Sequence, residues 1–305
     1  MNDPTITVSP TESAPPPPRP EEGEVIDILR PATQTLPVVF SSPHSGNRYP
    51  ESFVRASRLD RGMLRKSEDS FIDEIFGAAP RFGAPLIRAL FPRAFIDPNR
   101  EPFELDPDMF ADTLPSYVNV HSPRVAGGLG TIARVVANGA EIYRDKLTFA
   151  EAAERINTFY RPYHRALQEM IEATRARFGW CLLIDCHSMP SVGGPMDADT
   201  GRGRVDFVLG NCFGVSCDPA ITDHVDAELS RGAHTVTRNL PYSGGFTTVN
   251  YGRPNAGIHA LQIEINRQLY MDEDSYERLP GIAPLTTHMD TMIESLAGLC
   301  ARLQP

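Results

Sequence analysis

The sequence predicts an α/β protein in which helices cover both faces of a central sheet. Strand-like and helical patterns alternate along the chain, as they do in three-layer α/β sandwiches. The run from Trp180 to Ile184 is almost continuously apolar, which is typical of a central strand that is buried on both faces. Because no internal repeat and no second linker interrupts the alternation, we expect one α/β domain over residues 23–305.

The individual elements follow from the spacing of apolar residues. The expected strands are short apolar and β-branched runs at residues 36–40, 85–90, 94–97, 180–184, 205–209, 234–237 and 259–265. Amphipathic helices are expected at residues 69–82, 145–178, 219–231 and 283–302. Pro162 predicts a break or kink in the longest of them, because proline lacks the backbone N–H of a helix interior. Residues 1–22 are rich in Pro, Ser, Thr and Glu, so we expect a disordered tail there.

The composition argues against several classes of function. A formal net charge of -10 disfavours general binding to nucleic acid or to an anionic membrane, and an anionic substrate would need a local cluster of arginines. Five cysteines without a C-x-x-C pair suit a reducing cytoplasm better than a disulfide framework. The chain shows neither a signal-peptide pattern nor a stretch of about 20 apolar residues. We expect a soluble, cytoplasmic monomer or small homo-oligomer.

Two histidines stand at the ends of strand-like runs. His44 lies in the segment Pro43–Gly46 after the first run, and His187 lies in Ile184–Ser188 at the end of the central one. Histidines at the carboxyl ends of different strands can converge on one metal ion in the crevice above an open α/β sheet. The alternative is that each is a loop histidine held by backbone hydrogen bonds.

The residues beside His187 have distinct expected roles. Alternate side chains of a strand share a face, so Asp185 and His187 point the same way and Cys186 points the opposite way. Asp185 could therefore orient the imidazole of His187, or it could simply end the strand. Cys186 is a rival candidate as a nucleophile, but neighbours on a strand diverge, which disfavours a Cys186–His187 pair.

Two acidic residues complete the candidate site. A catalytic zinc usually takes three protein ligands, and Asp69, at the start of a predicted helix, is a candidate for the third. Aspartate is also a favoured helix N-cap, which is the structural alternative. Glu264 shares a strand face with Ala260 and Gln262, and such an acid either pairs with a cation, for example Arg267, or does chemistry.

Several loops have residues suited to holding a ligand. Arg100 ends the turn Asp97–Arg100, where it could bind a substrate carboxylate through two hydrogen bonds or be an ordinary surface residue. The glycine-rich segments 127–134 and 242–248 allow the backbone to approach a ligand closely. Neither contains the G-x-x-x-x-G-K-[ST] pattern of a phosphate-binding loop.

Taken together, these segments resemble the N-formylglutamate amidohydrolase family. The matching stretches are SSPHSGNRYP (41–50), EDSFIDEIF (68–76), FIDPNR (95–100), GLGTIARV (128–135), IDCHSMPS (184–191), DFVLGN (206–211), PYSGGFTTVNYGRP (241–254) and HALQIEINRQLYMDE (259–273). They occur in order and cover nearly everything after the tail, so the resemblance is specific.

The resemblance implies a fold and an activity. The family is similar to zinc carboxypeptidases, of the phosphorylase/hydrolase-like class, and to deacylases of N-acyl amino acids. It implies an α/β/α sandwich with a mixed central sheet and one Zn²⁺ per chain. The implied reaction is hydrolysis of the linear amide of N-formyl-L-glutamate to formate and L-glutamate, a step of histidine degradation. The domain at residues 23–305 would then be catalytic.

The resemblance also implies roles for individual residues. The implied metal ligands are His44, Asp69 and His187, and Glu264 is implied as the carboxylate that activates the attacking water. The expected substrate-binding residues are Asn99, Arg100, Arg134 and Thr248. Zinc carboxypeptidases place their ligands as H-x-x-E, whereas Asn47 stands three residues after His44. The carboxylate ligand must therefore lie farther along the chain, with Asp73 as the alternative to Asp69.

Three alternative functions remain open from the sequence. The chain could act on a different N-acyl amino acid, because the loops that shape the acyl pocket cannot be placed. It could be a catalytically silent binding protein of the same fold. A Cys186-dependent amidase is the third, and alkylation of the thiol would inactivate such an enzyme whereas chelation of metal would not.

Overall fold

The computed structural model describes residues 23–195 and 197–303. Within these ranges seven strands form one sheet in the order β1-β3-β2-β4-β7-β5-β6. The strands are β1 (Ile26–Leu29), β2 (Val38–Ser42), β3 (Leu86–Ala89), β4 (Cys181–Met189), β5 (Phe207–Gly210), β6 (Val236–Arg238) and β7 (Ile258–Asn266). The tail expected at residues 1–22 lies outside the described residues.

The sheet is mixed. Strands β3, β2, β4 and β7 are parallel neighbours, whereas β1 runs antiparallel to β3, and β5 runs antiparallel to β7 and parallel to β6. The carboxyl ends of β2, β4 and β7 therefore meet at one edge of the sheet. This edge is where an open α/β sheet places its ligand.

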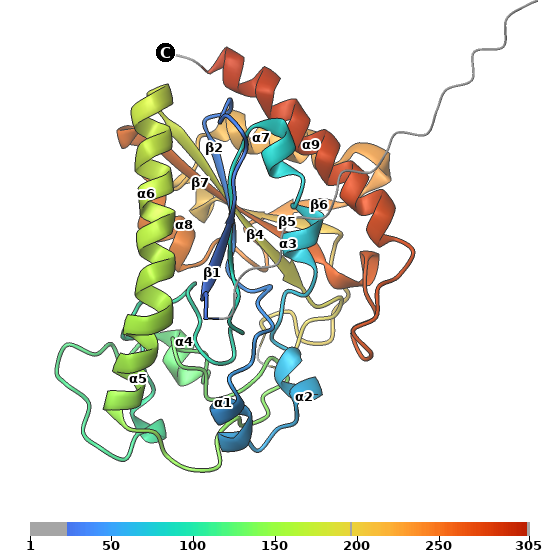
Figure 1. Cartoon of the computed structure of the whole chain (residues 1–305). Coiled ribbons are helices and arrows are strands. Elements are labelled where there is room, and N and C mark those ends of the chain that lie inside the picture. The colour runs from blue at the N-terminus through green and yellow to red at the C-terminus, as the bar shows by residue number, and fades with distance from the viewer. Residues whose placement is uncertain (1–22, 196, 304–305) are drawn as a thin grey trace, which may run out of the picture.

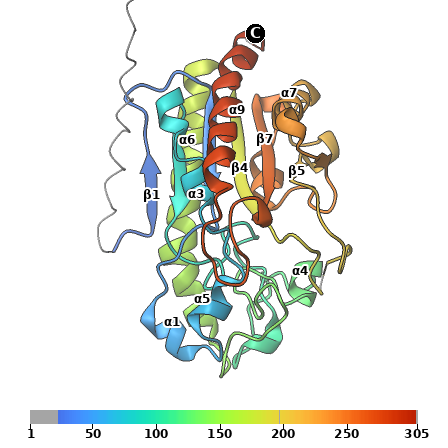
Figure 2. The same ribbon diagram turned by 90° about the vertical axis from the view of Figure 1, so that its right-hand side faces the viewer.

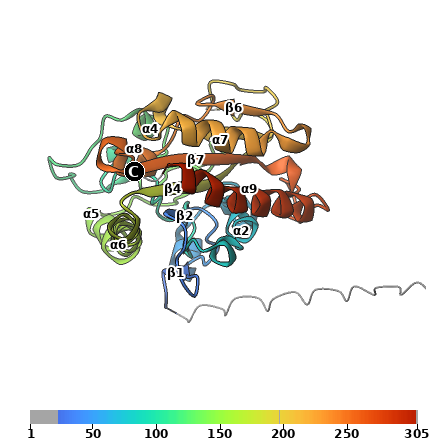
Figure 3. The same cartoon turned by 90° about the horizontal axis from the view of Figure 1, so that it is seen from above.

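Helices cover both faces of the sheet. They are α1 (Glu51–Ala56), α2 (Arg61–Arg65), α3 (Ile72–Ile75), α4 (Pro123–Ala126), α5 (Phe149–Arg155), α6 (Arg161–Phe178), α7 (Pro219–Leu229), α8 (Phe246–Tyr251) and α9 (Ile282–Arg302). Seen from above, α6 and α9 lie on opposite sides of the sheet (Figure 3). The short helices α1, α4 and α5 lie beyond the end at which β4 finishes (Figures 1 and 2). None of the helices in the described ranges is long and apolar enough to cross a membrane.

The central strand β4 divides the core into two halves. Leu182 and Ile184 belong to the apolar cluster under α7 and α9, whereas Cys181 and Leu183 belong to the cluster under α6. Every residue of β4 is buried, as its apolar run predicts. The three-layer α/β sandwich with a mixed sheet is thus confirmed.

Two expected elements are wrong in detail. Residues 94–97 form a turn instead of a strand, because the backbone N–H of Phe95 donates to the carbonyl of Pro92. The helix expected over residues 69–82 is reduced to α3 and a 3-10 turn at Ala79–Phe82. Phe71, with φ of 67°, starts α3 in the left-handed region, so the helix does not extend back to Asp69.

The long helix expected at residues 145–178 is interrupted where its sequence indicates. It begins at Phe149 with a capping box in which the Thr148 hydroxyl accepts from the backbone N–H of Glu151. A π-helical turn at Ile156–Tyr160 separates α5 from α6, immediately before Pro162. The proline lacks the N–H that a continuous helix needs, and the wider turn accommodates this.

Candidate active site

The side chains of the candidate site come from three parallel strands. His44 follows β2 by two residues, while His187 and Glu264 lie near the carboxyl ends of β4 and β7. In the register of these two strands, His187 is the direct partner of Glu264. The topology thus brings together residues that are more than 200 positions apart in the sequence.

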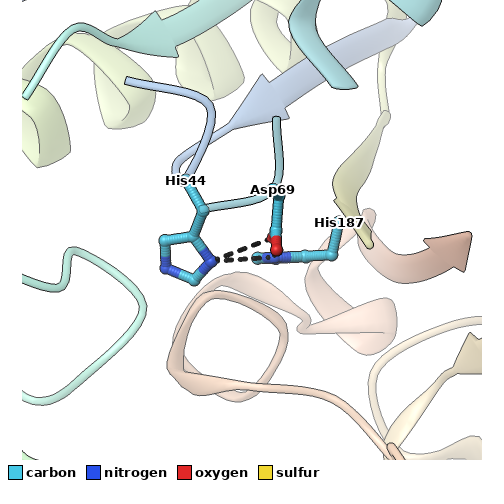
Figure 4. A group of neighbouring side chains, drawn as sticks. All are labelled: His44, Asp69 and His187. Atoms are coloured by element: carbon cyan, nitrogen blue, oxygen red, sulfur yellow. Dashed lines mark hydrogen bonds and ion pairs between the residues drawn. The ribbon is translucent and has the colours of Figure 1, made fainter. Parts of the chain in front are cut away.

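Three potential ligand atoms converge at this edge (Figure 4). The two Nδ1 atoms of His44 and His187 lie 3.1 Å apart. Asp69 Oδ2 lies 3.3 Å from Nδ1 of His44 and 3.1 Å from Nδ1 of His187. Metal–ligand bonds of about 2.0–2.1 Å in a tetrahedral site separate ligand atoms by roughly 3.3 Å, so this cluster has the right size for zinc.

The opposite side of each imidazole is bonded to a carboxylate. Nε2 of His44 donates to Oδ1 of Asp97 over 2.7 Å, and Nε2 of His187 donates to Oδ2 of Asp185 over 2.8 Å. With their protons on Nε2, both histidines turn Nδ1 lone pairs toward Oδ2 of Asp69. Three electron-rich atoms at such short range repel one another unless a cation lies between them, so the residues fit a metal ion. Asp185 thus contacts His187 on their shared strand face, as the orienting role predicted for it requires.

Asp69 is held by its second carboxylate oxygen. Oδ1 accepts from Nη2 of Arg267 at 3.0 Å and from the hydroxyl of Ser188 at 3.2 Å. Although burial opposes ionisation, the neighbouring imidazoles of His187 and His44 and the charge of Arg93 hold the pKa of Asp69 well below its usual range. Its backbone N–H donates to the carbonyl of His44, which joins the two segments. The N-cap of α3 is Phe71, so capping does not explain Asp69.

Asp73, the alternative carboxylate, lies elsewhere. Its Oδ2 accepts from Nη1 of Arg88 at 2.8 Å, and Arg88 also pairs with Asp27. The metal-sized cluster found among the described residues contains Asp69 and not Asp73.

Cys186 faces away from the histidines, as strand alternation predicts. Its side chain is fully buried in the apolar cluster on the α9 side of the sheet. Burial and the charge of Asp185 raise the pKa of the thiol well above its usual value. A buried, protonated thiol is a poor nucleophile, which counts against the Cys186 alternative.

Glu264 is buried, and its carboxylate lines the cavity beside the metal-sized cluster. Oε1 accepts from Nε2 of Gln262 at 2.7 Å. Burial raises the pKa of this carboxyl above its usual value, and the charge of Asp69 adds to the effect. The salt bridge to Arg267 considered above is not formed, because Arg267 binds Asp69. A carboxyl with a raised pKa can both accept and donate a proton near neutral pH.

The cavity has a polar floor and a basic wall. His44, His187, Glu264 and Gln262 line it on the sheet side. The two glycine-rich loops contribute Leu129 and Gly130 and the segment 242–245, as their sequences indicate. Four arginines also line it, namely Arg93, Arg100, Arg124 and Arg267. They supply the local positive charge that an anionic ligand needs in a protein of net charge -10.

The arginines differ in how they are neutralised. Nη2 of Arg93 pairs with Oδ2 of Asp97 at 2.8 Å. Burial tends to lower the pKa of Arg93, but the carboxylates of Asp97 and Asp69 hold it above its usual value. Arg100 instead donates to two backbone carbonyls, those of Leu129 and of Asn99, both at 2.8 Å. Burial lowers the pKa of the Arg100 guanidinium to about 10.

A family model described as "N-formylglutamate amidohydrolase" matches residues 36–271. The chain belongs to the N-formylglutamate amidohydrolase family. The matched region contains the three cluster residues, Glu264 and the arginines of the cavity wall.

Individual relatives agree with the family. N-formylglutamate deformylase of Pseudomonas aeruginosa is 29% identical over 246 residues, which is 79% of this chain and 84% of the relative. The enzyme of the same name from Pseudomonas putida is 29% identical over 244 residues, 78% of this chain and 83% of the relative. The crystal structure of N-formylglutamate amidohydrolase from Ralstonia eutropha JMP134 is similar with a TM-score of 0.84 and 37% identity, covering 91% of this chain and 99% of that one.

Two of the expected substrate-binding residues, Arg134 and Thr248, lie outside the lining of the cavity described above. Nε of Arg134 pairs with Oδ2 of Asp106 at 2.9 Å, and its side chain lines a separate surface hollow. Thr248 is buried in α8, where its hydroxyl donates to the carbonyl of Gly245 at 2.8 Å. Asn99 does line the cavity, and its Oδ1 accepts from the backbone N–H of Thr247 at 2.8 Å.

Two arginines of this family member were missed by the sequence reasoning. Arg93 lies four residues before Asp97, and this spacing next to the recognised turn was a usable signal. Arg124 follows Ser122 and Pro123 in a segment that has neither a periodic spacing of apolar residues nor a recognisable ligand-binding motif. Its place in the cavity wall depends on tertiary contacts that no local pattern records.

Proposed function

We propose that this protein hydrolyses the amide of N-formyl-L-glutamate to formate and L-glutamate, with one zinc ion held by His44, Asp69 and His187. The observation that carries the proposal is the convergence of two imidazole nitrogens and a carboxylate oxygen beside Glu264, in a cavity walled by arginines. The names of the relatives support the same substrate. Such a reaction would belong to histidine degradation.

The metal and the chain have separate tasks in this reaction. Two histidines and a carboxylate are a known ligand set of catalytic zinc, and a bound zinc would act as a Lewis acid toward water and the formyl carbonyl. Asp97 and Asp185 keep the imidazoles in the tautomer that leaves Nδ1 free.

Glu264 transfers the proton. Its carboxylate accepts a proton from the attacking water as the new C–O bond to the formyl carbon forms. It then donates that proton to the nitrogen of glutamate as the C–N bond breaks, which releases formate and the free amine. The hydrogen bond from Gln262 fixes the position of Oε1 during both transfers.

Arg93 stabilises the charge that develops on the formyl oxygen. Its guanidinium is held by Asp97, lines the cavity and interacts electrostatically with Asp69 and Glu264. A fixed cation in a buried site interacts more strongly with a developing negative charge than water would.

Arg100, together with Asn99, holds the α-carboxylate of the substrate. Nδ2 of Asn99 lies 3.2 Å from Nε2 of His187, so this turn is close to the cluster. A guanidinium matches a carboxylate with two parallel hydrogen bonds.

The deciding experiment is an assay of the purified chain on N-formyl-, N-acetyl- and N-succinyl-L-glutamate, each with and without a chelator. We expect hydrolysis of the formyl compound, loss of activity with the chelator and recovery with added zinc. A preference for a larger acyl group would assign the protein to another N-acyl amino acid. Binding without turnover of any compound by the zinc-loaded protein would identify a catalytically silent binding protein.

A further inference from the structure

Two arginines of the cavity wall, Arg100 and Arg124, have no carboxylate of the described residues close enough for a hydrogen bond. Arg93 is neutralised by Asp97, but the carboxylate nearest to Arg100, also that of Asp97, lies 3.9 Å from its Nη2. Arg124 is exposed, and among residues 23–195 and 197–303 it has no ion pair and no side-chain hydrogen bond. Both lack a carboxylate within hydrogen-bonding distance.

Arg100 and Arg124 both form hydrogen bonds with the backbone of Leu129. The backbone N–H of Leu129 donates to the carbonyl of Arg124 at 2.8 Å. The carbonyl of Leu129 in turn accepts from Nε of Arg100 at 2.8 Å. The two arginines therefore form parts of a single wall of the cavity.

The proximity of two cations has an electrostatic cost. After burial, the charge of Arg124 is the strongest influence that lowers the pKa of Arg100. Two like charges kept close, neither with a described carboxylate within hydrogen-bonding distance, indicate a site that is completed by an anionic ligand.

The two arginines lie at different depths. Arg100 is buried and follows Asn99, which contacts His187, whereas Arg124 is exposed on α4. In an N-formyl amino acid the α-carboxylate is attached to the carbon bonded to the amide nitrogen. The side-chain carboxylate of glutamate is two carbons farther from that nitrogen than the α-carboxylate. With the amide at the cluster, the α-carboxylate matches Arg100, and the more distant group reaches toward the rim of the cavity.

We propose that Arg124 binds the side-chain carboxylate of the substrate and so determines the specificity for an acidic over a neutral amino acid. This inference rests on the proposed function, because it takes the orientation of the substrate from the amide at the cluster. It assigns selectivity to a residue that takes no part in the bond-breaking steps.

The test compares two substrates that differ only in the charge of the side chain. N-formyl-L-glutamine has nearly the same shape as N-formyl-L-glutamate but carries an amide in place of the distal carboxylate. In Arg124→Gln, kcat/KM for the glutamate compound should fall about 10- to 100-fold, mainly through KM, as expected for one charge-assisted hydrogen bond. For the glutamine compound kcat/KM should change less than about threefold, and Arg124→Lys should retain part of the preference for glutamate. Arg165→Gln, which removes an exposed arginine of α6, is the matched control and should leave both substrates unaffected.

Calorimetric binding of the products L-glutamate and L-glutamine to the zinc-loaded protein provides a readout without turnover. The wild type should prefer glutamate, and Arg124→Gln should lose this preference. An equal loss for both substrates, or an unchanged preference for glutamate, would overturn the role of Arg124. If the wild type hydrolyses neither formyl compound, the proposed function fails, and the binding preference still decides the specificity role.

Discussion

His187 and Glu264 occupy directly opposed positions on the parallel strands β4 and β7. His187 is a candidate metal ligand and Glu264 is the candidate proton carrier. The two chemical roles thus fall on a directly paired position of neighbouring strands. Both strands are buried at the centre of the fold, and such strands keep their side chains in place better than loops do. The arginines proposed to bind the substrate lie outside the sheet, Arg100 in a turn and Arg124 on the short helix α4. Sequence changes there can alter specificity without disturbing the reacting groups.

Replacing Glu264 by glutamine should separate proton transfer from metal binding. The variant keeps the shape of the side chain but cannot accept the proton of water, so turnover should fall about 10²- to 10⁴-fold. Its zinc content, measured by elemental analysis, should equal that of the wild type. Near-normal turnover would remove Glu264 from the mechanism.

Asp69→Asn should reduce bound zinc, because an amide is a weaker ligand than a carboxylate. His44→Ala and His187→Ala should have the same effect, since each removes one atom of the cluster. Asp73→Asn is the matched control, because its carboxylate binds Arg88 outside the cluster, and it should retain full stoichiometry. Full zinc content in Asp69→Asn would take Asp69 off the ligand set.

Asp185→Asn should weaken metal binding without removing a ligand. The carboxylate that accepts from Nε2 of His187 would become an amide, and the imidazole would lose its fixed tautomer. Loss of such an orienting carboxylate typically costs about 10- to 100-fold in metal affinity. Competition with a chelator of known affinity measures the change, and an unchanged zinc affinity would contradict the orienting role.

Arg100→Ala should mainly raise KM, since the guanidinium lines the cavity and is proposed to bind the α-carboxylate. Arg134 pairs with Asp106 in a separate hollow, so Arg134→Ala should change KM much less. Steady-state kinetics on N-formyl-L-glutamate would compare the two. If KM rises only in Arg134→Ala, the positions of these side chains in the structure do not describe the substrate complex.

The stability of the fold should depend on His164 at mildly acidic pH. Burial lowers the pKa of His164 to about 4, and its Nε2 donates to the carbonyl of Pro98 at 2.8 Å. In the unfolded chain a histidine titrates near pH 6.5, so between pH 6.5 and 4 the unfolded state binds the proton and the folded state does not. The free energy of unfolding should therefore fall by up to about 3 kcal/mol over this range as the pH is lowered.

Urea unfolding of the wild type and of His164→Gln at pH 7 and pH 4.5 measures this contribution. The variant should be less stable at pH 7, because it loses the packing and hydrogen bonds of the imidazole. It should lose less stability than the wild type on acidification. Identical losses in the two proteins would show that His164 does not cause the acid sensitivity.

Much of the fold follows from local patterns, and the site follows from them only in part. The apolar runs that became β4 and β7 were predictable, and with them the placement of His187 and Glu264 at one edge of the sheet. The point at which the helix expected over residues 69–82 begins was not predictable. The left-handed backbone of Phe71, which sets it, has no effect on the spacing of apolar residues. The pairing of Arg267 with Asp69 instead of Glu264 depends on how three distant segments pack.

The carboxylate of Asp69 uses one oxygen for hydrogen bonds and presents the other to the cluster, which limits the number of ligand atoms that the protein can provide to a metal. Because Arg267 and Ser188 occupy Oδ1, this aspartate presents a single oxygen to the cluster and cannot chelate through both. The cluster therefore offers three donor atoms, and a bound four-coordinate ion would keep one position for a small exchangeable molecule. Arg267, which lines the same cavity, would thus help to determine how many positions of a bound ion stay open to a small molecule.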